Sequence, residues 1–388
     1  MAKEEKKAPK LRFNGYTNDW ERKELNNILK INSGRDYKQL NSGNIPVYGT
    51  GGYMLSVNDK LSDTDAVGIG RKGTIDKPLY LKAPFWTVDT LFYCTSKENS
   101  DVKFIYLLFQ IINWKRYDES TGIPSLSKNT ISNIKTYVPK IKEQDYISKL
   151  FFSLDNTIQL HERKCEELTL IKQALLQKLF PKKDKVRPEV RYKNFSDAWE
   201  QRKLNNFLET SKLKNLNHKF KKEDILSVSG DYGIVNQMEF QGRSFAGASL
   251  KNYRVVEKQN VVYTKSPLKA NPYGIIKANK GNKGIVSTLY AVYKTKGDVS
   301  ANFVEYYFAN DYRLNAYLKP IVNKGAKNTI LISDDNAING KVIFPLDHVE
   351  QKKIGAFLAD FDSLITLHQG KLEKLKKMKK FLLQNMFI

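Results

Sequence analysis

The chain has 388 residues, 41% hydrophobic and 12% aromatic, which is enough to form buried cores in two or more domains. Its formal net charge of +24 favours a polyanionic partner such as a nucleic acid, because such an excess repels itself in a compact protein. The richest apolar run, residues 104–112, is too short to span a bilayer and the charged first residues lack a signal segment, so we expect a cytoplasmic protein without membrane contact.

The first 141 residues predict a globular domain. It opens on the segment NDWERKELNNIL, residues 18–29. Runs rich in β-branched and aromatic residues follow at residues 45–54, 65–75 and 85–95, separated by turn residues. Residues 101–114 predict a helix, followed by a polar loop and a short segment that ends before Pro139.

A long helix is predicted over residues 142–180, where the sequence contains no proline until position 181. The linker 181–190 is charged and carries two prolines, so it ends this helix. A second globular domain is predicted over residues 191–347, with strand-like runs at 224–230, 260–266 and 284–295, one helix at 300–314 and a loop at 323–328. A second long helix is predicted over residues 348–388.

Two internal repeats link the halves of the chain. The opening segment returns as DAWEQRKLNNFL, residues 197–208, and Arg12 recurs as Arg191 at the same offset. The long segments repeat as well, because Glu143, Gln144 and many later residues of 143–180 return in 350–387. We therefore expect one structural unit twice, with a shared framework and different loops.

Apolar residues in both long segments follow steps of four and three, the 3.5-residue period of a coiled coil. We expect the two helices to pair with each other, antiparallel, because the chain must return to its start. Separate amphipathic helices on their own domains are the alternative. His161 with His368, and Lys172 with Lys379, interrupt both seams and are expected to set the register. The residues expected to pair the helices are Ile147, Leu154, Ile158, Leu168, Leu175, Ile354, Phe361, Ile365, Leu375 and Leu382.

Candidate binding residues lie in the loops of both domains, where hydroxyls, backbone amides and cations could contact phosphate or bases. Ordinary hairpin turns with solvated charge are the alternative. In the first domain the candidates are Tyr48, Thr50, Gly51, Tyr53, Arg71, Lys72, Thr74, Ser120, Thr121 and Ser125. In the second domain they are Ser229, Tyr232, Arg243, Lys265, Ser266, Lys269, Lys324 and Lys327.

Catalytic motifs are weak by comparison. The chain has no G-x-x-x-x-G-K-[ST] phosphate loop, and its four histidines and two cysteines are scattered, so neither a catalytic site nor a metal site is predicted. Residues 271–274, Asn-Pro-Tyr-Gly, partly match the Asn-Pro-Pro-Tyr motif of amino-methyltransferases, but a β-turn explains them better. Asp334 and Asp335 are expected in a turn or a helix cap.

The sequence resembles the specificity subunit of type I restriction-modification systems. The resemblance rests on the duplicated WE…LNN segments at 20–27 and 199–206, on TGIPSLSKNTISNIKTYVPKIKEQ at 121–144, and on the two repeated helices. It covers nearly the whole chain. The second domain departs from this pattern, because it lacks the G-I-P-S-L phrase of the first and has only NKGAKNTI before Pro345.

This resemblance implies an α+β fold with two target-recognition domains, residues 1–141 and 191–347, joined by an antiparallel coiled coil. It implies a non-catalytic subunit in which each domain reads one half of a bipartite, asymmetric site in double-stranded DNA. The helices would set the spacer and dock two methyltransferase subunits, and motor-nuclease subunits would complete the complex. S-adenosylmethionine, ATP and Mg²⁺ would belong to those partners, and this chain would bind no cofactor.

Two other functions remain open from the sequence alone. The chain could be a self-contained DNA methyltransferase or nuclease with a fused specificity module, which binding of S-adenosylmethionine by the isolated chain would indicate. It could also be a tandem scaffold whose charge serves RNA or an acidic protein, which competition by duplex DNA would distinguish.

Overall fold

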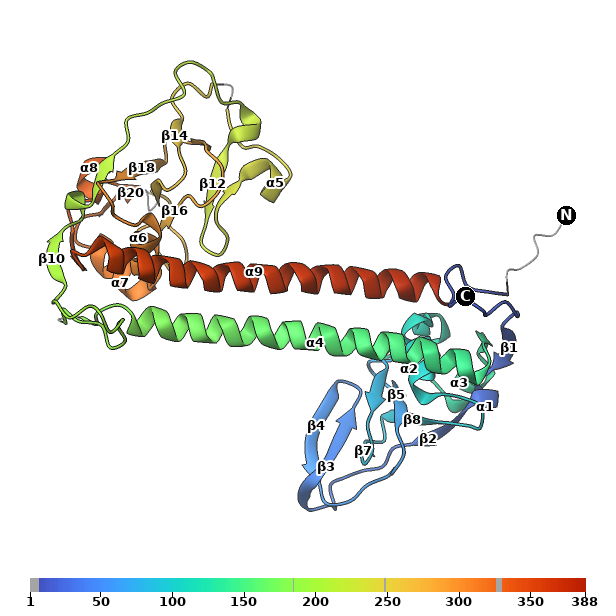
Figure 1. Cartoon of the computed structure of the whole chain (residues 1–388). Helices are drawn as coiled ribbons and strands as arrows, with labels where there is room; N and C mark the ends of the chain where they lie inside the picture. Colours follow the sequence, from blue (N-terminus) through green and yellow to red (C-terminus); the bar gives the residue numbers. More distant parts are fainter. Residues whose placement is uncertain (1–6, 184, 248, 326–329) are drawn as a thin grey trace. The chain divides into compact units, whose positions relative to one another are not determined.

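The computed structural model describes residues 7–183, 185–247, 249–325 and 330–388 (Figure 1). The chain divides into two compact units. The first unit comprises Met1–Glu162 and Gly370–Ile388, and the second unit comprises Arg163–Gln369. Each unit therefore contains one globule and parts of both long helices, whereas the boundaries predicted from sequence treated each helix as a separate segment.

The globule of the first unit is built on a four-stranded antiparallel sheet with the strand order β2-β8-β5-β6. A smaller sheet, β4-β3-β7, extends from it, and β1 pairs with β9. The elements are β1 (Glu21–Glu24), α1 (Leu25–Ile28), β2 (Leu29–Ser33), β3 (Ser42–Gly49), β4 (Gly52–Val57), β5 (Ala66–Gly70), β6 (Leu79–Leu81), β7 (Trp86–Thr87), β8 (Leu91–Ser96), α2 (Val102–Ile111), a 3₁₀ turn (Trp114–Tyr117), α3 (Lys128–Asn133) and β9 (Lys135–Val138).

The globule of the second unit repeats this plan, because its main sheet has the equivalent order β11-β18-β15-β16 and β10 pairs with β21. The elements are β10 (Glu200–Lys203), a 3₁₀ turn (Leu204–Asn206), β11 (Leu208–Thr210), a 3₁₀ turn (Lys222–Asp224), β12 (Leu226–Ser229), β13 (Gly233–Asn236), α5 (Gln237–Gln241), β14 (Arg254–Val256), β15 (Val261–Thr264), β16 (Ile276–Ala278), β17 (Gly284–Val286), β18 (Tyr290–Thr295), α6 (Ala301–Tyr307), α7 (Asp311–Leu318), β19 (Asn323–Lys324), β20 (Ile330–Leu331), α8 (Asp334–Ala337) and β21 (Lys341–Phe344). The prediction of a mixed fold with helices and strands is confirmed.

One predicted element is wrong in its extent. Residues 300–314 form no single helix, because α6 ends at Tyr307 and α7 begins at Asp311. The side chain of Asn310 accepts a hydrogen bond from the backbone N–H of Arg313 at 3.0 Å and thereby caps α7. Asparagine stabilises a helix start better than a helix interior, and this capping preference prevailed over the apolar periodicity on which the single helix was predicted.

The two long helices are α4 (Ile141–Lys178) and α9 (His348–Asn385), each of 38 residues. A buried glutamine anchors the start of each helix to its globule. Gln144 donates to the carbonyl of Pro139 at 2.8 Å and accepts from the N–H of Asp101 at 3.0 Å. Gln351 makes the equivalent contacts with Pro345 and Ser300, at 2.8 and 3.3 Å. These bonds explain why this glutamine appears in both repeats.

The repeated Trp-Glu segment also has a structural role. In the first unit, Arg12 donates two hydrogen bonds to the carboxylate of Glu143, at 2.6 and 2.8 Å, and the indole N–H of Trp20 lies 3.4 Å from the same carboxylate. Glu143 is only 1% exposed, and its carboxylate raises the pKa of Arg12. In the second unit the same three-residue arrangement consists of Arg191, Trp199 and Glu350.

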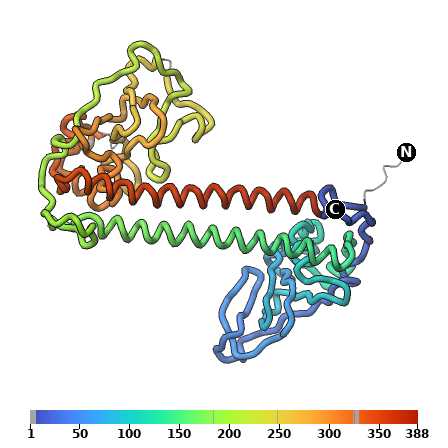
Figure 2. The backbone as a smooth tube through the Cα atoms, viewed as in Figure 1, coloured from blue at the N-terminus to red at the C-terminus, as the bar shows by residue number. Residues whose placement is uncertain are grey.

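The end of each long helix packs into the globule of the unit that contains it. In the first unit, Phe387 lies 6.1 Å from Trp20 and 5.4 Å from Phe104 between ring centres. Figure 2 shows the C-terminal end of the chain beside the first described residues, where the N–H of Leu11 donates to the carbonyl of Asn385 at 2.8 Å. In the second unit, Phe180 packs on Trp199 and Phe303 in the same way.

Segments of α4 and α9 contact each other within each unit. In the first unit, Asp155 pairs with Lys379 at 2.6 Å and Glu162 with Lys376 at 2.7 Å, so the residue numbers of the two helices run in opposite directions. In the second unit, Lys172 pairs with Asp362. Of the residues predicted to pair the helices, Ile147, Leu154, Ile158 and Ile354 are buried, and Leu168, Leu175, Phe361, Ile365, Leu375 and Leu382 are half-buried.

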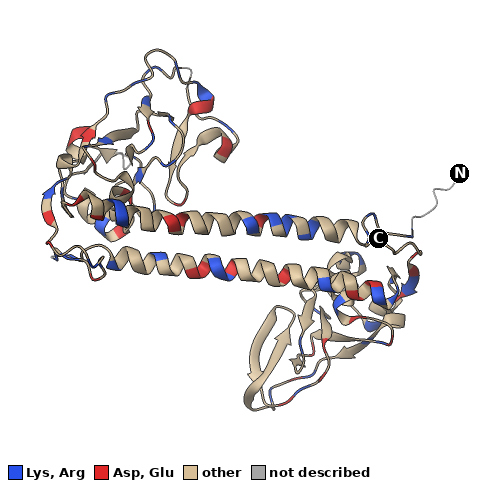
Figure 3. Ribbon diagram, viewed as in Figure 1, with Lys and Arg blue, Asp and Glu red and all other residues tan. Residues whose placement is uncertain are grey.

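Charged residues mark much of the surface of both long helices, including a basic stretch in the C-terminal half of α9 (Figure 3). Among the described residues, no helix is both long enough and apolar enough to cross a lipid bilayer.

Candidate nucleic-acid interface

Three loops that the sequence predicted to bind DNA come together in the first unit. The carbonyl of Arg71, just after β5, accepts from the N–H of Leu126 at 2.9 Å. The N–H of Gly73 donates to the carbonyl of Pro124 at 2.8 Å. The turn between β3 and β4 lies against the same place, because a side-chain carbon added to Gly73 would be 3.7 Å from the hydroxyl oxygen of Thr50.

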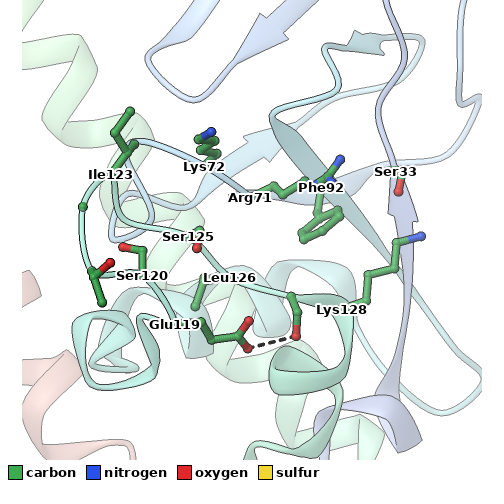
Figure 4. A pocket seen from close by; sticks show the side chains of 13 residues that line it. Ser33, Arg71, Lys72, Phe92, Glu119, Ser120, Ile123, Ser125, Leu126 and Lys128 are labelled. Carbon is green, nitrogen blue, oxygen red and sulfur yellow. Dashed lines mark hydrogen bonds between the residues drawn. The ribbon is translucent and has the colours of Figure 1, made fainter.

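Two of these loops, the one after β5 and the one at residues 119–126, border a cleft of about 900 Å³, which we call the first-unit cleft (Figure 4). It opens at the end of β2 and β5, beside β8 and the start of α3. Its lining residues are Ser33, Arg71, Lys72, Phe92, Glu119, Ser120, Thr121, Gly122, Ile123, Ser125, Leu126, Ser127 and Lys128.

Asp118 holds the loop at one wall of this cleft in a fixed shape. Its carboxylate accepts from the backbone N–H of Ser125 at 2.9 Å and from the N–H and hydroxyl of Ser120 at 3.0 and 2.9 Å. These hydrogen bonds lower the pKa of Asp118, with the Ser125 N–H contributing most. The predicted residues Ser120, Thr121 and Ser125 therefore lie on a loop whose shape is held by the side chain of Asp118.

The charges that line the first-unit cleft are mainly positive. Arg71, Lys72 and Lys128 are exposed, and within the described part of the chain none of them pairs with a carboxylate. Glu119 is the acidic lining residue, but its carboxylate accepts from the hydroxyls of Ser127 and Thr130. The ammonium of Lys128 lies 5.8 Å from the ring centre of Phe92. The cleft is therefore suited to an anion such as a DNA phosphate.

The hairpin next to this cleft carries the predicted tyrosines. The rings of Tyr48 and Tyr53 lie 6.4 Å apart, and the hydroxyl of Tyr53 is 3.1 Å from that of Ser56. Tyr48 is half-buried, whereas Tyr53 is 63% exposed. Thr50 and Gly51 form the turn between them. Only the outer tyrosine is thus free to contact a partner with most of its ring.

The strand registers fix which residues of the second unit are equivalent. Gly70 pairs with Leu91, and Thr264 with Tyr290, at the same point of the two main sheets, so Lys265 occupies the position of Arg71. The short helices α3 and α8 start after a capping serine and lead to equivalent strands, so Asp334 occupies the position of Lys128.

The second unit fills this position with an internal ion-pair cluster. Asp334 pairs with Lys265 at 2.6 Å and also with Arg254, and the three side chains are 13%, 16% and 20% exposed. A smaller cleft of about 420 Å³, the second-unit cleft, is lined by Thr210, Ser211, Lys212, Lys214, Arg254, Asp334 and Asp335. Lys265 was predicted to bind DNA, but its ammonium already has a carboxylate partner.

Other predicted residues of the second unit lie apart from this cleft. Ser229 shapes the turn between β12 and β13 by accepting from the N–H groups of Asp231 and Tyr232 at 3.3 and 3.2 Å. Tyr232 is 66% exposed, and the guanidinium of Arg243 lies 4.7 Å from the ring centre of Phe245. Of the remaining candidates in the second unit, Lys269 is exposed, Ser266 is half-buried and Lys324 lies in β19. Lys327 lies outside the described residues. In the first unit, the remaining candidate Thr74 is half-buried.

The methyltransferase-like segment 271–274 forms a turn, as the sequence indicated. The N–H of Gly274 donates to the carbonyl of Asn271 at 3.0 Å, which closes a β-turn. Gly274 has a φ of +92°, and a Cβ there would lie 1.9 Å from the carbonyl oxygen of Thr264, so only glycine fits.

Among the described residues, no three His, Cys, Asp or Glu side chains gather as metal ligands. Burial raises the pKa of the Cys94 thiol to about 12.

The sequence did not identify three residues that define these clefts, Lys128, Arg254 and Asp334. Lys128 follows a capping serine in an otherwise ordinary short helix, and Asp334 was expected only in a turn or cap. Their importance depends on contacts between segments that are far apart in sequence. Alignment of the two halves by strand register would have been needed to find them.

Comparison with known proteins supports the resemblance stated above. Residues 17–170 match the family model of the type I restriction modification DNA specificity domain. The chain is 28% identical over 170 residues to a putative type I specificity subunit of Mycoplasma genitalium, which is 40% of this chain and 43% of that protein. It is 35% identical over 68 residues to the MjaVIII specificity subunit of Methanocaldococcus jannaschii, covering 18% of this chain and 16% of that protein.

The matched segments therefore span less than half of these curated relatives. Among solved structures, the S subunit of a type I restriction-modification system from M. genitalium is similar over 98% of this chain and 99% of that one, with a TM-score of 0.68 and 14% sequence identity. At this identity the likeness concerns the fold. The predicted resemblance to specificity subunits is confirmed.

Proposed function

We propose that this chain, whose residues 17–170 match the type I specificity domain, is the non-catalytic DNA-recognition subunit of a type I restriction-modification complex. The observation that carries the proposal is the duplicated framework with different loops. The same four-stranded sheet occurs twice, and at equivalent edges it presents two chemically different clefts. A protein that reads two unlike half-sites needs this combination.

Each globule then reads one half of a bipartite, asymmetric site in double-stranded DNA. The formal charge of +24 favours the phosphate backbone, which supplies much of the affinity of DNA-binding proteins. The exposed loops supply hydroxyls, cations and aromatic rings that differ between the two units, as sequence discrimination requires.

The long helices act as the spacer, pairing as an antiparallel coiled coil. Two ion pairs within the first unit support an antiparallel arrangement, because the residue number rises along α4 from Asp155 to Glu162 while that of its partner in α9 falls from Lys379 to Lys376. A helix of 38 residues is about 57 Å long at 1.5 Å per residue. This length can accommodate two recognition domains one turn of DNA apart, about 34–36 Å.

The helices also offer a surface for two methyltransferase subunits. Each helix has one face against the globule and one seam against the other helix, which leaves a third face exposed. That face carries apolar residues at equivalent positions of the two repeats: Leu160 and Leu367 are 53% and 52% exposed, and Ile171 and Met378 are 48% and 47% exposed. Equal exposure at repeated positions fits a partner that binds twice.

The partners would supply the chemistry of the complex. S-adenosylmethionine would be bound by the methyltransferase subunits, and ATP and Mg²⁺ by motor-nuclease subunits that join them. The alternative of a self-contained methyltransferase has little support, because its best motif is the turn at residues 271–274.

Methylome sequencing tests the proposal. Genomic DNA from cells with the chain should carry one bipartite methylated motif that disappears when only this chain is deleted. Loss of no motif, while the chain is expressed with its methyltransferase, would refute the proposed function.

The spacer role has its own test. Seven residues, one coiled-coil heptad, are inserted after Lys164 and again after the equivalent Lys371, so that both seams keep their phase. The insertion adds about 10.5 Å, which corresponds to about three base pairs at 3.4 Å each. The methylated motif should keep both half-sites and gain that spacer. An unchanged spacer in an active complex would leave the helices as docking surfaces only.

A further inference from the structure

We propose that the two units bind DNA with unequal electrostatics: the first-unit cleft binds a backbone phosphate between Arg71 and Lys128, whereas Asp334 takes the place of that phosphate in the second unit. The inference rests on the proposed function, because it assumes that DNA is the partner. It concerns which residues neutralise phosphate and why the two halves differ.

Arg71 and Lys265 occupy equivalent positions in the two units. Arg71 follows Gly70 of β5, and Lys265 follows Thr264 of β15, at the same register against β8 and β18. Their backbones also agree, since Arg71 N–H donates to the carbonyl of Thr90 and Lys265 N–H to that of Leu289, at 2.8 and 3.0 Å. A cation thus stands at this sheet edge in both units.

The residue opposite that cation differs in sign. The first residue of α3 is Lys128, after the capping Ser127, and the first residue of α8 is Asp334, after the capping Ser333. In the second unit the carboxylate binds the cation at 2.6 Å and recruits Arg254 as well. In the first unit the corresponding residues are both cationic and cannot bind each other.

The surroundings decide what the first-unit cleft can hold. Arg71, Lys72 and Lys128 line it and are exposed, so three cations outnumber the one carboxylate, Glu119, which accepts from two hydroxyls. Like charges that share a cleft repel each other until an anion lies between them. Phosphate oxygens match this need, because guanidinium and ammonium groups both donate charge-assisted hydrogen bonds to them. Figure 4 shows these cations around the cleft.

At the position of Lys265 the second unit needs no external anion, although the exposed Lys212 and Lys214 also line the second-unit cleft. Asp334, Lys265 and Arg254 are each at most 20% exposed, so their charges are largely satisfied within the protein. The second-unit cleft is also smaller, about 420 Å³ against about 900 Å³. DNA binding by the second unit must therefore depend on groups other than Lys265 and Arg254. These two residues should contribute little to the salt dependence of DNA affinity.

The salt dependence of DNA binding tests the proposal. The full chain, purified with its methyltransferase subunits, is titrated into a fluorescent 30-base-pair duplex that carries the motif from methylome sequencing, at several salt concentrations. Each phosphate contact contributes about 0.9 to the slope of log K against log salt. Because both cations share one phosphate, Arg71→Ala and Lys128→Ala should each reduce the slope by up to about 0.9, and the matched Lys265→Ala should leave it unchanged.

Asp334→Asn provides the reciprocal test, because it releases Lys265 and Arg254. Its slope should become steeper by about 0.9 or more. If this variant fails to fold, as judged by circular dichroism, the three alanine variants decide the matter alone.

Equal loss of slope for Lys265→Ala and Arg71→Ala would overturn the proposal. So would an altered methylation motif with an unchanged slope in Arg71→Ala, because that result indicates a base contact. Absence of duplex binding by the unmodified complex would instead refute the proposed function.

Discussion

Removal of the Glu143 carboxylate should destabilise the first unit without affecting DNA specificity. Glu143 is 1% exposed and accepts two hydrogen bonds from Arg12, whose side chain is 13% exposed. Glu143→Ala leaves this guanidinium, and the indole N–H of Trp20, without their acceptor. Breaking a buried ion pair by removing one partner costs about 3–5 kcal/mol, because the other charge stays desolvated.

The expected change in melting temperature follows from the size of the unit. The first unit has roughly 180 residues, and for that size 1 kcal/mol corresponds to about 2–4 °C. Glu143→Ala should therefore lower its melting temperature by about 6–20 °C. Differential scanning calorimetry of the full chain measures this change.

The repeat supplies a matched control. Glu350→Ala removes the equivalent carboxylate, which accepts from Arg191 at 2.7 and 2.8 Å, and should lower the transition of the second unit alone. A double variant, Arg12→Met with Glu143→Leu, should recover most of the loss, because apolar replacement of both partners leaves no unpaired charge. A loss below about 0.5 kcal/mol in Glu143→Ala, typical of surface substitutions, would refute this reasoning.

Three further predictions concern the second unit. Burial raises the pKa of Asp362, but hydrogen bonds from Lys172 and Tyr306 outweigh it, so the pKa is lowered overall. The ionised Asp362 therefore stabilises the folded protein above about pH 4. Asp362→Asn should cost roughly 0.5–1 kcal/mol in urea unfolding at pH 7 but less below pH 4. Burial lowers the pKa of Lys277, so the unfolded chain binds more protons than the folded one between the lowered value and 10.5. Lys277→Met should stabilise the protein by about 1 kcal/mol at pH 7, because its distant partner Glu305 keeps Lys280 at 3.0 Å, and this advantage should shrink as the pH approaches 10.5. Gly274→Ala should destabilise by more than ~1 kcal/mol, because the added carbon meets the carbonyl of Thr264, and a normal melting curve for this variant would contradict the turn geometry.

The sequence determined the repeated architecture because its signals are local or periodic. The constant offset between the two halves predicted one framework used twice, and both four-stranded sheets have equivalent strand orders. The 3.5-residue period predicted the long helices, which begin within a residue of the expected positions at Ile141 and His348. A regular spacing of apolar residues can be recognised in one sequence, because every repeat of the period adds evidence for the same helix.

The tertiary structure decided the chemistry of the clefts. Arg71 and Lys265 were both predicted as DNA contacts, and no local feature of the sequence separates them. Their difference comes from Lys128 and Asp334, which lie 57 and 69 residues further along the chain, respectively. An ion pair depends on the distance between side chains in space, and a partner that distant in sequence cannot be read from the residues around either cation.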